Sequence, residues 1–378
     1  MKKYLLVAAA IVTLSMLSLV PLARQAQPLQ SSNLTPRRAW ERMMSAAITD
    51  IDLSYNGRCV AVSTSQSFVV FDSAGLELWR WDFTKDNRFA VAQKLAVSPK
   101  CDWVAFAGGP EYRYLWIVHQ HGSRIPIKTE GTPLSVAISH TGTSVAIGTG
   151  AGSLALYSSE GKLQWNVNAG GGQLPVQEIS FAVDDHAIMV SSYAHAIVSA
   201  TGKPLPLGGA WGVGSMRAAR DFKTFVTWGE PPHGPGIGQL SVLDGNGKVL
   251  WSKVSSDPRA IISPAGDLVV AQTNDNQNPS EEDGFEPQRL NLSKALRLFS
   301  KTGTVVRTFS AHGSPVAFSS DGRSFVLSDS SGFVLLDLNE TPLWNISKSG
   351  YPGFVSTPDF RSVVLTQNNL VEWYSFPN

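Results

Sequence analysis

Two histidines stand one residue apart at the end of a short apolar stretch and could supply part of a metal site. His119 and His121 lie in the segment WIVHQHG, and residues that alternate along a β-strand share one face. A zinc site needs three or four protein ligands. No third ligand with a recognisable spacing accompanies this pair, so we interpret both histidines as surface residues beside a turn. The sequence leaves open whether the chain holds a metal.

The chain contains only two cysteines, Cys59 and Cys101. Each lies near the start of a predicted strand, in neighbouring repeats of the chain. In an exported protein they could form a disulfide. Their positions within the repeat differ by two residues, which favours two buried thiols, with a disulfide as the alternative.

The short motifs of well-known catalytic sites are absent from the sequence. It contains no G-x-S-x-G nucleophile elbow, no H-E-x-x-H helix and no glycine-rich phosphate loop. We therefore predict no catalytic residue and no bound cofactor.

The elements that would position any site repeat along the chain. The segment SVLDGNGKVLW, which ends at Trp251, has the pattern strand, tight turn, strand, and related segments end at Trp79, Trp165 and Trp344. A polar turn followed by a second apolar strand precedes each of these. Eight such turns occur, at Gly57, Cys101, Gly142, Asp185, Phe222, Gly266, Gly322 and Phe360. Their spacing of 37 to 56 residues brackets the period of about 40 to 50 residues that is typical of four-stranded propeller blades.

Each repeat therefore predicts a sheet of four strands, a to d from the first to the last. One such sheet cannot bury both faces alone, so the sheets must pack face to face around an axis. The repeated tryptophans could form an aromatic binding surface. Their fixed place in each repeat favours packing between blades instead.

Composition agrees with an all-β protein. Of 378 residues, 33 are glycine and 22 are proline, while only 16% are charged. This indicates many short strands joined by turns. The formal net charge of +1 argues against a nucleic-acid partner, which selects for a basic surface.

The last repeat supplies only three strands before the chain ends. We expect the segment near residues 37–46, which contains Trp40, to be the fourth strand of that blade. This predicts an eight-bladed propeller over residues 39–378. Seven blades are the alternative, if the last repeat only caps the ring.

The N-terminus resembles an export segment. Lys2 and Lys3 precede an apolar stretch from Tyr4 to Ala23, about long enough to cross a bilayer as a helix. We expect residues 1–23 to be an uncleaved signal anchor, with a cleaved signal peptide as the alternative, and residues 24–38 to be a linker. Either outcome places the body outside the cytoplasm, anchored to the membrane or free in the periplasm or medium.

The repeats resemble two propeller superfamilies. The pattern formed by Asp244, Gly247 and Trp251 is similar to the tryptophan-docking repeat of quinoprotein-like (PQQ-type) propellers. The turn formed by Asp321 and Gly322 resembles that of WD-repeat propellers. The resemblance implies architecture only, because these folds serve enzymes and scaffolds alike. Quinone-dependent members use a vicinal cysteine pair and an acidic calcium site on a longer chain, and this chain lacks the pair.

Two insertions follow the second strand in adjacent repeats, at residues 229–239 and 274–293, and a smaller one spans 108–114. We expect them on one end of the ring, where long loops on a rigid scaffold carry binding. The acidic run in the longest insertion does not match the spacing of a calcium-binding loop. It could be a partner-binding loop or only a solvated one. The candidate binding residues are Glu111, Tyr112, His233, Asp275, Glu281, Glu282, Asp283 and Phe285.

The sequence thus predicts a non-catalytic, extracytoplasmic propeller that binds a protein or small ligand on the end that bears the insertions. One alternative is an enzyme, quinoprotein-like or of another kind, with an active site on the axis. Another is a factor for outer-membrane protein assembly, which would pair an exposed apolar strip with partner strands.

Overall fold

A computed structural model describes residues 36–83, 94–108, 113–169, 174–191, 195–207, 214–229, 238–255, 258–274, 294–348 and 353–376. The chain divides into two units, 1–32 and 33–378, and every described residue belongs to the second. The predicted N-terminal helix over residues 1–23 lies outside the described residues. Within the described ranges, no helix has the length and hydropathy that crossing a membrane requires.

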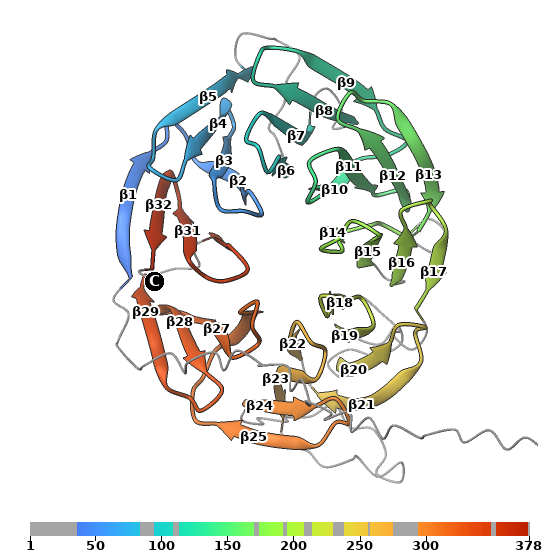
Figure 1. Cartoon of the computed structure of the whole chain (residues 1–378), viewed down its shortest axis with the longest axis vertical. Helices are drawn as coiled ribbons and strands as arrows, with labels where there is room; N and C mark the ends of the chain where they lie inside the picture. The colour runs from blue at the N-terminus through green and yellow to red at the C-terminus, as the bar shows by residue number, and fades with distance from the viewer. Residues whose placement is uncertain are drawn as a thin grey trace, which may run out of the picture. The chain divides into compact units, whose positions relative to one another are not determined.

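The described strands form eight antiparallel sheets of four strands each (Figure 1). Blades 1 to 4 contain β2 (Ile48–Leu53), β3 (Cys59–Thr64), β4 (Ser67–Asp72) and β5 (Glu77–Asp82); β6 (Lys94–Val97), β7 (Trp103–Gly108), β8 (Tyr114–His119) and β9 (Arg124–Lys128); β10 (Pro133–Ile138), β11 (Ser144–Thr149), β12 (Ser153–Ser158) and β13 (Leu163–Asn168); and β14 (Glu178–Phe181), β15 (Ala187–Ser191), β16 (Ala196–Ser199) and β17 (Pro204–Pro206).

Blades 5 to 8 contain β18 (Gly214–Ala218), β19 (Thr224–Gly229), β20 (Gly238–Asp244) and β21 (Val249–Ser255); β22 (Arg259–Ile262), β23 (Leu268–Asn274), β24 (Lys294–Ser300) and β25 (Val305–Phe309); β26 (Ser314–Phe318), β27 (Ser324–Asp329), β28 (Gly332–Asp337) and β29 (Pro342–Ser347); and β30 (Gly353–Ser356), β31 (Ser362–Gln367) and β32 (Leu370–Ser375) with β1 (Arg37–Met43). The fold is the predicted eight-bladed, all-β propeller, and the seven-bladed alternative is excluded.

The ring closes between strands from opposite ends of the chain. Strand β1 pairs with β32 in antiparallel register, so that Trp40 lies opposite Trp373 and Glu41 opposite Glu372 (Figure 1). Inner strand β2 of blade 1 also contacts β30 of blade 8. The closing strand therefore hides the edge of β32, which would otherwise be free to pair with other chains.

The eight turns found by their sequence pattern share one backbone conformation. All eight turn residues have φ between 56° and 71°, in the left-handed region. Glycine adopts this conformation without strain, but Cys101, Asp185, Phe222 and Phe360 also adopt it. Side chains around the turn stabilise it: the Ser54 hydroxyl accepts hydrogen bonds from the N–H groups of Arg58 and Cys59, both at 3.0 Å. Each turn links strand a to strand b.

The repeated tryptophans pack between blades, as predicted. Trp79, Trp165, Trp251 and Trp344 each lie on a strand d and join the hydrophobic cluster shared with the following blade. Trp165 donates from Nε1 to the Ala200 carbonyl oxygen of the next blade at 2.8 Å. The ring lies so close to Gly202 that a Cβ there would fall 2.8 Å from the indole Cγ, and φ of that glycine is 82°.

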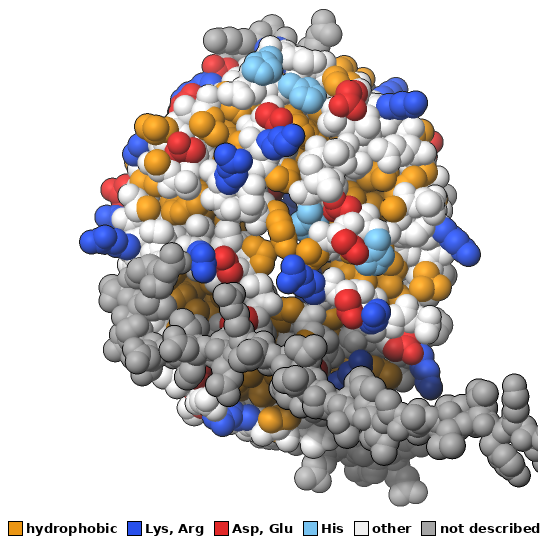
Figure 2. All heavy atoms as spheres, in the orientation of Figure 1, with side chains coloured by type: hydrophobic (Ala, Val, Ile, Leu, Met, Phe, Trp, Pro, Cys, Tyr) orange, Lys and Arg blue, Asp and Glu red, His pale blue; other side chains and the backbone are white. Residues whose placement is uncertain are grey.

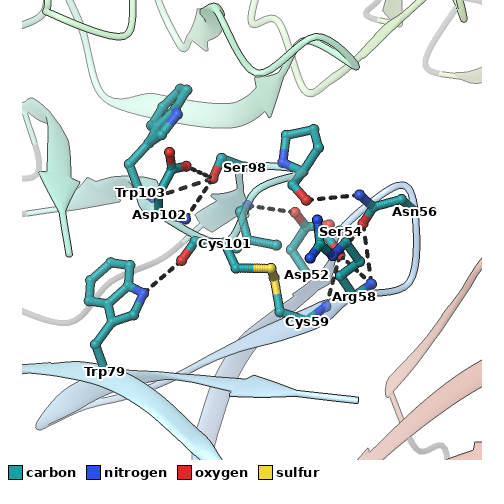
Figure 3. The surroundings of a disulfide bond; sticks show 12 residues. Asp52, Ser54, Asn56, Arg58, Cys59, Trp79, Ser98, Cys101, Asp102 and Trp103 are labelled. Atoms are coloured by element: carbon teal, nitrogen blue, oxygen red, sulfur yellow. Dashed lines mark hydrogen bonds between the residues drawn. A yellow bond between two sulfur atoms is a disulfide. The ribbon is translucent and has the colours of Figure 1, made fainter.

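The expectation of two free thiols is wrong, because Cys59 and Cys101 form a disulfide (Figure 3). Equal positions in adjacent blades do not lie opposite each other, since neighbouring blades meet in a staggered arrangement. Cys101 occupies the turn of blade 2 and lies beside the first residue of β3 in blade 1. The two Cα atoms are 6.1 Å apart, a separation that a disulfide spans. The sulfurs join blades 1 and 2 covalently.

Candidate binding sites at the ends of the propeller axis

The two ends of the ring carry different connections. The a–b turns and the c–d turns lie at one end, here called the turn end. The b–c connections leave from the other, here called the insertion end. Strands β19 and β20, and likewise β23 and β24, are joined at the insertion end by the two long segments that the sequence singled out. Their candidate residues (Glu111, Tyr112, His233, Asp275, Glu281, Glu282, Asp283, Phe285) all lie outside the described residues.

A cavity of about 670 Å³ opens among the inner strands of blades 4 to 7 near the insertion end. Its volume is within the range of about 300–1,000 Å³ that is typical of ligand pockets. The described residues that line it are Gln177, Gly214, Ser215, Arg217, Trp228, Gly229, Pro258, Arg259, Ser314, Pro315, Val316 and Ser328. Two arginines, three serines and one tryptophan thus gather where strand a begins and strand b ends.

The two arginines of this cavity differ in their contacts. Arg217 on β18 donates from Nη1 to Glu178 at 2.9 Å and to the Met216 carbonyl oxygen at 2.8 Å. Its guanidinium carbon lies 5.6 Å from the centre of the Trp228 ring. Arg259, the first residue of β22, is exposed and forms no hydrogen bond or ion pair with any described residue. The Arg217 guanidinium is therefore fixed, whereas no described residue fixes the Arg259 guanidinium.

The turn end has two smaller cavities, of about 450 and 310 Å³, which share Tyr55 and Pro358 as wall residues. The Tyr55 ring meets the His140 ring edge-on, with ring centroids 4.2 Å apart. Tyr55 belongs to blade 1 and His140 to blade 3, so the contact spans the turn of blade 2. Figure 2 shows one end of the ring, where hydrophobic side chains gather around a central hollow with charged and histidine side chains beside them.

His140 is held in place by Asp185 of the next blade. An oxygen of Asp185 accepts the His140 N–H at 2.8 Å and lies 3.1 Å from ring Nδ1. Burial alone would raise the pKa of Asp185, but hydrogen bonds from the backbone of His140 and Thr141 outweigh it and lower the pKa. The carboxylate thus stays ionised and orients the imidazole at the rim of the 310 Å³ cavity.

Asp52 lies in the wall of the same cavity and links two blades. Its Oδ2 accepts the Val97 N–H of β6 at 2.8 Å, and Asp50 accepts the Leu95 N–H at the same distance. Burial raises the pKa of Asp52 to about 7, and the negative charge of Asp50 adds to the rise. Protonated Asp52 can still accept the Val97 hydrogen bond, so this contact holds blades 1 and 2 together in either state.

Asp52 should make the stability of the fold depend on pH. Its pKa is about 7 in the folded chain and about 4 in an unfolded one. Between these values the folded state retains a proton that the unfolded state has lost, so stability falls as the pH rises. We expect Asp52→Asn, which keeps the acceptor oxygen, to gain stability over the natural chain from pH 4.5 to pH 7.5. Urea unfolding at both pH values measures this, and an equal difference at both would contradict it.

The described residues contain no cluster of three or more His, Cys, Asp or Glu side chains placed to bind a metal ion. His119 is partly buried, and its Nε2 lies 3.1 Å from the Ser159 carbonyl oxygen, while His121 is exposed. The two histidines stand beside the turn after β8.

Sequence reasoning missed Arg217, Arg259, Asp52 and Tyr55. The first three are charged residues on strand a, an inner strand whose other residues are mostly apolar or small, as in PRAII. A charged residue on such a strand faces either the axis or the next blade. Such residues were therefore the signal in the sequence for a site at either place. Tyr55 had no comparable signal, because polar turns commonly contain an exposed aromatic residue.

Comparison with known proteins identifies the fold alone. No protein-family model and no curated protein matches the chain. The solved structure described as the Dos1 propeller superposes with a TM-score of 0.62 at 13% identity, covering 90% of this chain and 95% of that one. Altogether 1587 chains of solved structures match, so the likeness is to a widespread architecture that does not select a function.

Proposed function

We propose that this chain is an extracytoplasmic propeller that binds a partner at its insertion end and performs no chemistry of its own. The observation that carries the proposal is the 670 Å³ cavity, in which no described residue forms a hydrogen bond or ion pair with Arg259. The strands around it are those from which the two long b–c connections leave. A rigid ring that fixes a polar cavity beside long connections is the arrangement by which scaffolds present binding surfaces.

Two features support a location outside the cytoplasm. Lys2 and Lys3 precede the apolar stretch at residues 4–23, a pattern read by the export machinery. The Cys59–Cys101 disulfide is stable in an oxidising compartment and rare in the cytosol. An uncleaved leader would hold the propeller at the membrane, and cleavage would release it. We propose a protein or small ligand as the partner, and no nucleic acid and no cofactor.

Removing the longest connection should remove the partner and preserve the fold. Asn274 of β23 lies opposite Lys294 of β24, so a two-residue Asn-Gly turn can replace residues 275–293 and close the hairpin. We expect this variant of the full chain to lose the proteins that co-purify with the natural chain from native membranes or periplasm, identified by mass spectrometry. Its thermal unfolding should stay unchanged. The same partners at the same yield would contradict the proposal.

An enzyme with a site at the turn end is a second candidate. Asp52, with its raised pKa, and the oriented His140 line one cavity there. We rank this second because the neighbouring hydroxyl is already engaged: Ser139 Oγ accepts the N–H groups of Thr143 and Ser144 and bonds Thr141. A role in outer-membrane protein assembly has less support, since the described outer strands carry at most two large exposed apolar side chains each, and β9 and β29 carry none.

A further inference from the structure

The charged side chains that line the cavity at the insertion end, among the described residues, are all positive. Its described lining contains Arg217 and Arg259 and no acidic residue. The net charge of the whole chain is +1, so two arginines in one cavity are a local concentration of positive charge. Among the described residues, Glu178 is the acidic residue next to the lining in the chain, and it is bound to Arg217. Counting the described residues alone, one full positive charge remains in the cavity after this pair is formed.

Arg217 is held in place with donors to spare. Its ion pair with Glu178 and its bond to the Met216 carbonyl oxygen both use Nη1. The Nε and Nη2 donors have no partner among the described residues. The Trp228 ring, 5.6 Å from the guanidinium carbon, supports the same group. A guanidinium fixed in this way loses little conformational freedom when it binds an anion.

Arg259, which has no hydrogen bond or ion pair with another described residue, supplies a second guanidinium from the adjacent blade. Inner strands β18 and β22, which carry the two arginines, contact each other. A guanidinium presents its donors in a planar fork that matches the two oxygens of a carboxylate. The pair therefore favours a ligand with more than one carboxylate, or with one carboxylate shared between the forks.

The rest of the lining suits a peptide better than a free ion. Trp228, Pro258, Pro315 and Val316 offer apolar walls. Gln177 and the hydroxyls of Ser215, Ser314 and Ser328 can exchange hydrogen bonds with a peptide backbone. A small dicarboxylate or phosphate would leave most of a 670 Å³ cavity unfilled. Apolar walls between charged and neutral donors match an extended segment with acidic and apolar side chains.

We propose that the insertion-end cavity binds an acidic peptide segment of a partner protein, whose carboxylates are bound by Arg217 and Arg259 while its apolar side chains lie against Trp228. This inference rests on the proposed binding function, since it names the chemistry of the partner at that site. Positive charge at the cavity also speeds the approach of an acidic partner, an effect that salt weakens.

Fluorescence anisotropy with a defined probe tests the assignment on the full chain. The probe is a fluorescein-labelled peptide of alternating glutamate and phenylalanine, and its matched control has glutamine in place of glutamate. We expect the acidic peptide to bind and the control to bind at least tenfold more weakly. Arg259→Ala should lower the affinity for the acidic peptide by about tenfold or more, because it removes a charged hydrogen bond. Arg323→Ala, at an exposed site on the turn end, should leave the affinity unchanged.

Several results would overturn the inference. Equal binding of the acidic and glutamine peptides, or an unchanged affinity in Arg259→Ala, would show that the cavity does not recognise the carboxylates of the peptide. Full displacement of the peptide by equimolar succinate or inorganic phosphate would assign the cavity to a small free anion. The proposed function fails separately: its partners would persist when residues 275–293 are replaced, whatever the result with the peptide. Loss of those partners with no effect of Arg259→Ala on the peptide would refute the acidic-peptide inference alone.

Discussion

Replacing both Cys59 and Cys101 by serine is expected to lower the free energy of unfolding by about 4 kcal/mol. The disulfide closes a loop with a sequence separation of 42 residues, and a crosslink across a loop of that length restricts the unfolded chain by about this amount. The disulfide lies beside the hydrogen bond that Trp79 donates to the Cys101 carbonyl oxygen (Figure 3). Asp52, which is near the same disulfide, accepts the Val97 N–H. Urea unfolding of the natural chain and the double variant, followed by tryptophan fluorescence, measures the loss.

A reductant provides the control for this prediction. Dithiothreitol should destabilise the natural chain to nearly the level of the double serine variant and should leave that variant unchanged. If the natural chain unfolds at the same urea concentration with and without the reductant, and the double serine variant unfolds at that concentration as well, the disulfide does not stabilise the fold. Since the cysteines join blades 1 and 2, a loss confined to these blades would appear as an early phase in the unfolding curve.

Replacing Trp40 by alanine should cost about 3–5 kcal/mol, the range for removing a large buried aromatic side chain. Trp40 lies on the strand that closes the ring and is only 7% exposed. Its ring centroid is 5.7 Å from those of both Phe71 and Trp373, and its Nε1 donates to the Ser73 carbonyl oxygen at 3.1 Å. The variant therefore weakens the closure of blade 8, where β1 and β32 come from opposite ends of the chain and are held together by pairing and packing alone. It also weakens the packing of this blade on Phe71 of blade 1. Thermal and urea unfolding would both show the loss.

Two matched variants separate ring closure from the loss of an aromatic side chain. Trp40→Phe keeps most of the packing and loses the hydrogen bond, so we expect a loss nearer 1 kcal/mol from that bond. Trp251→Ala removes a partly buried tryptophan with the same role inside the continuous chain. It should cost less than Trp40→Ala. A larger loss in Trp251→Ala would show that closure by β1 is not a critical junction.

The blades could be predicted from the sequence because each repeat carries its own local signal. A residue that adopts positive φ marks every a–b turn, and tryptophan marks the outer strand of alternate blades, where it packs on the next blade. These signals depend on neighbours in the chain. The Cys59–Cys101 disulfide could not be predicted in this way, because it depends on the stagger between two blades, which repeat positions alone do not reveal.

The candidate site was predictable only in part. Insertion lengths indicated which end of the ring to consider, but the residues that they singled out lie outside the described ranges. Arg217 and Arg259 stand 42 residues apart in short strands with no motif, and only the adjacency of β18 and β22 brings them to one cavity. Asp52 likewise gains its raised pKa from burial against blade 2. Such sites depend on blade-to-blade geometry, which the repeat pattern does not encode.

If partners bind at the insertion end, two variants compared side by side by co-purification should behave differently. One variant replaces residues 275–293 by an Asn-Gly turn. The other, Tyr55→Ala, removes a wall residue that both turn-end cavities share. We expect the first variant to lose the proteins that co-purify with the natural chain and the second to retain them. Retention by the first variant together with loss by Tyr55→Ala would contradict this expectation and would place the binding site at the turn end.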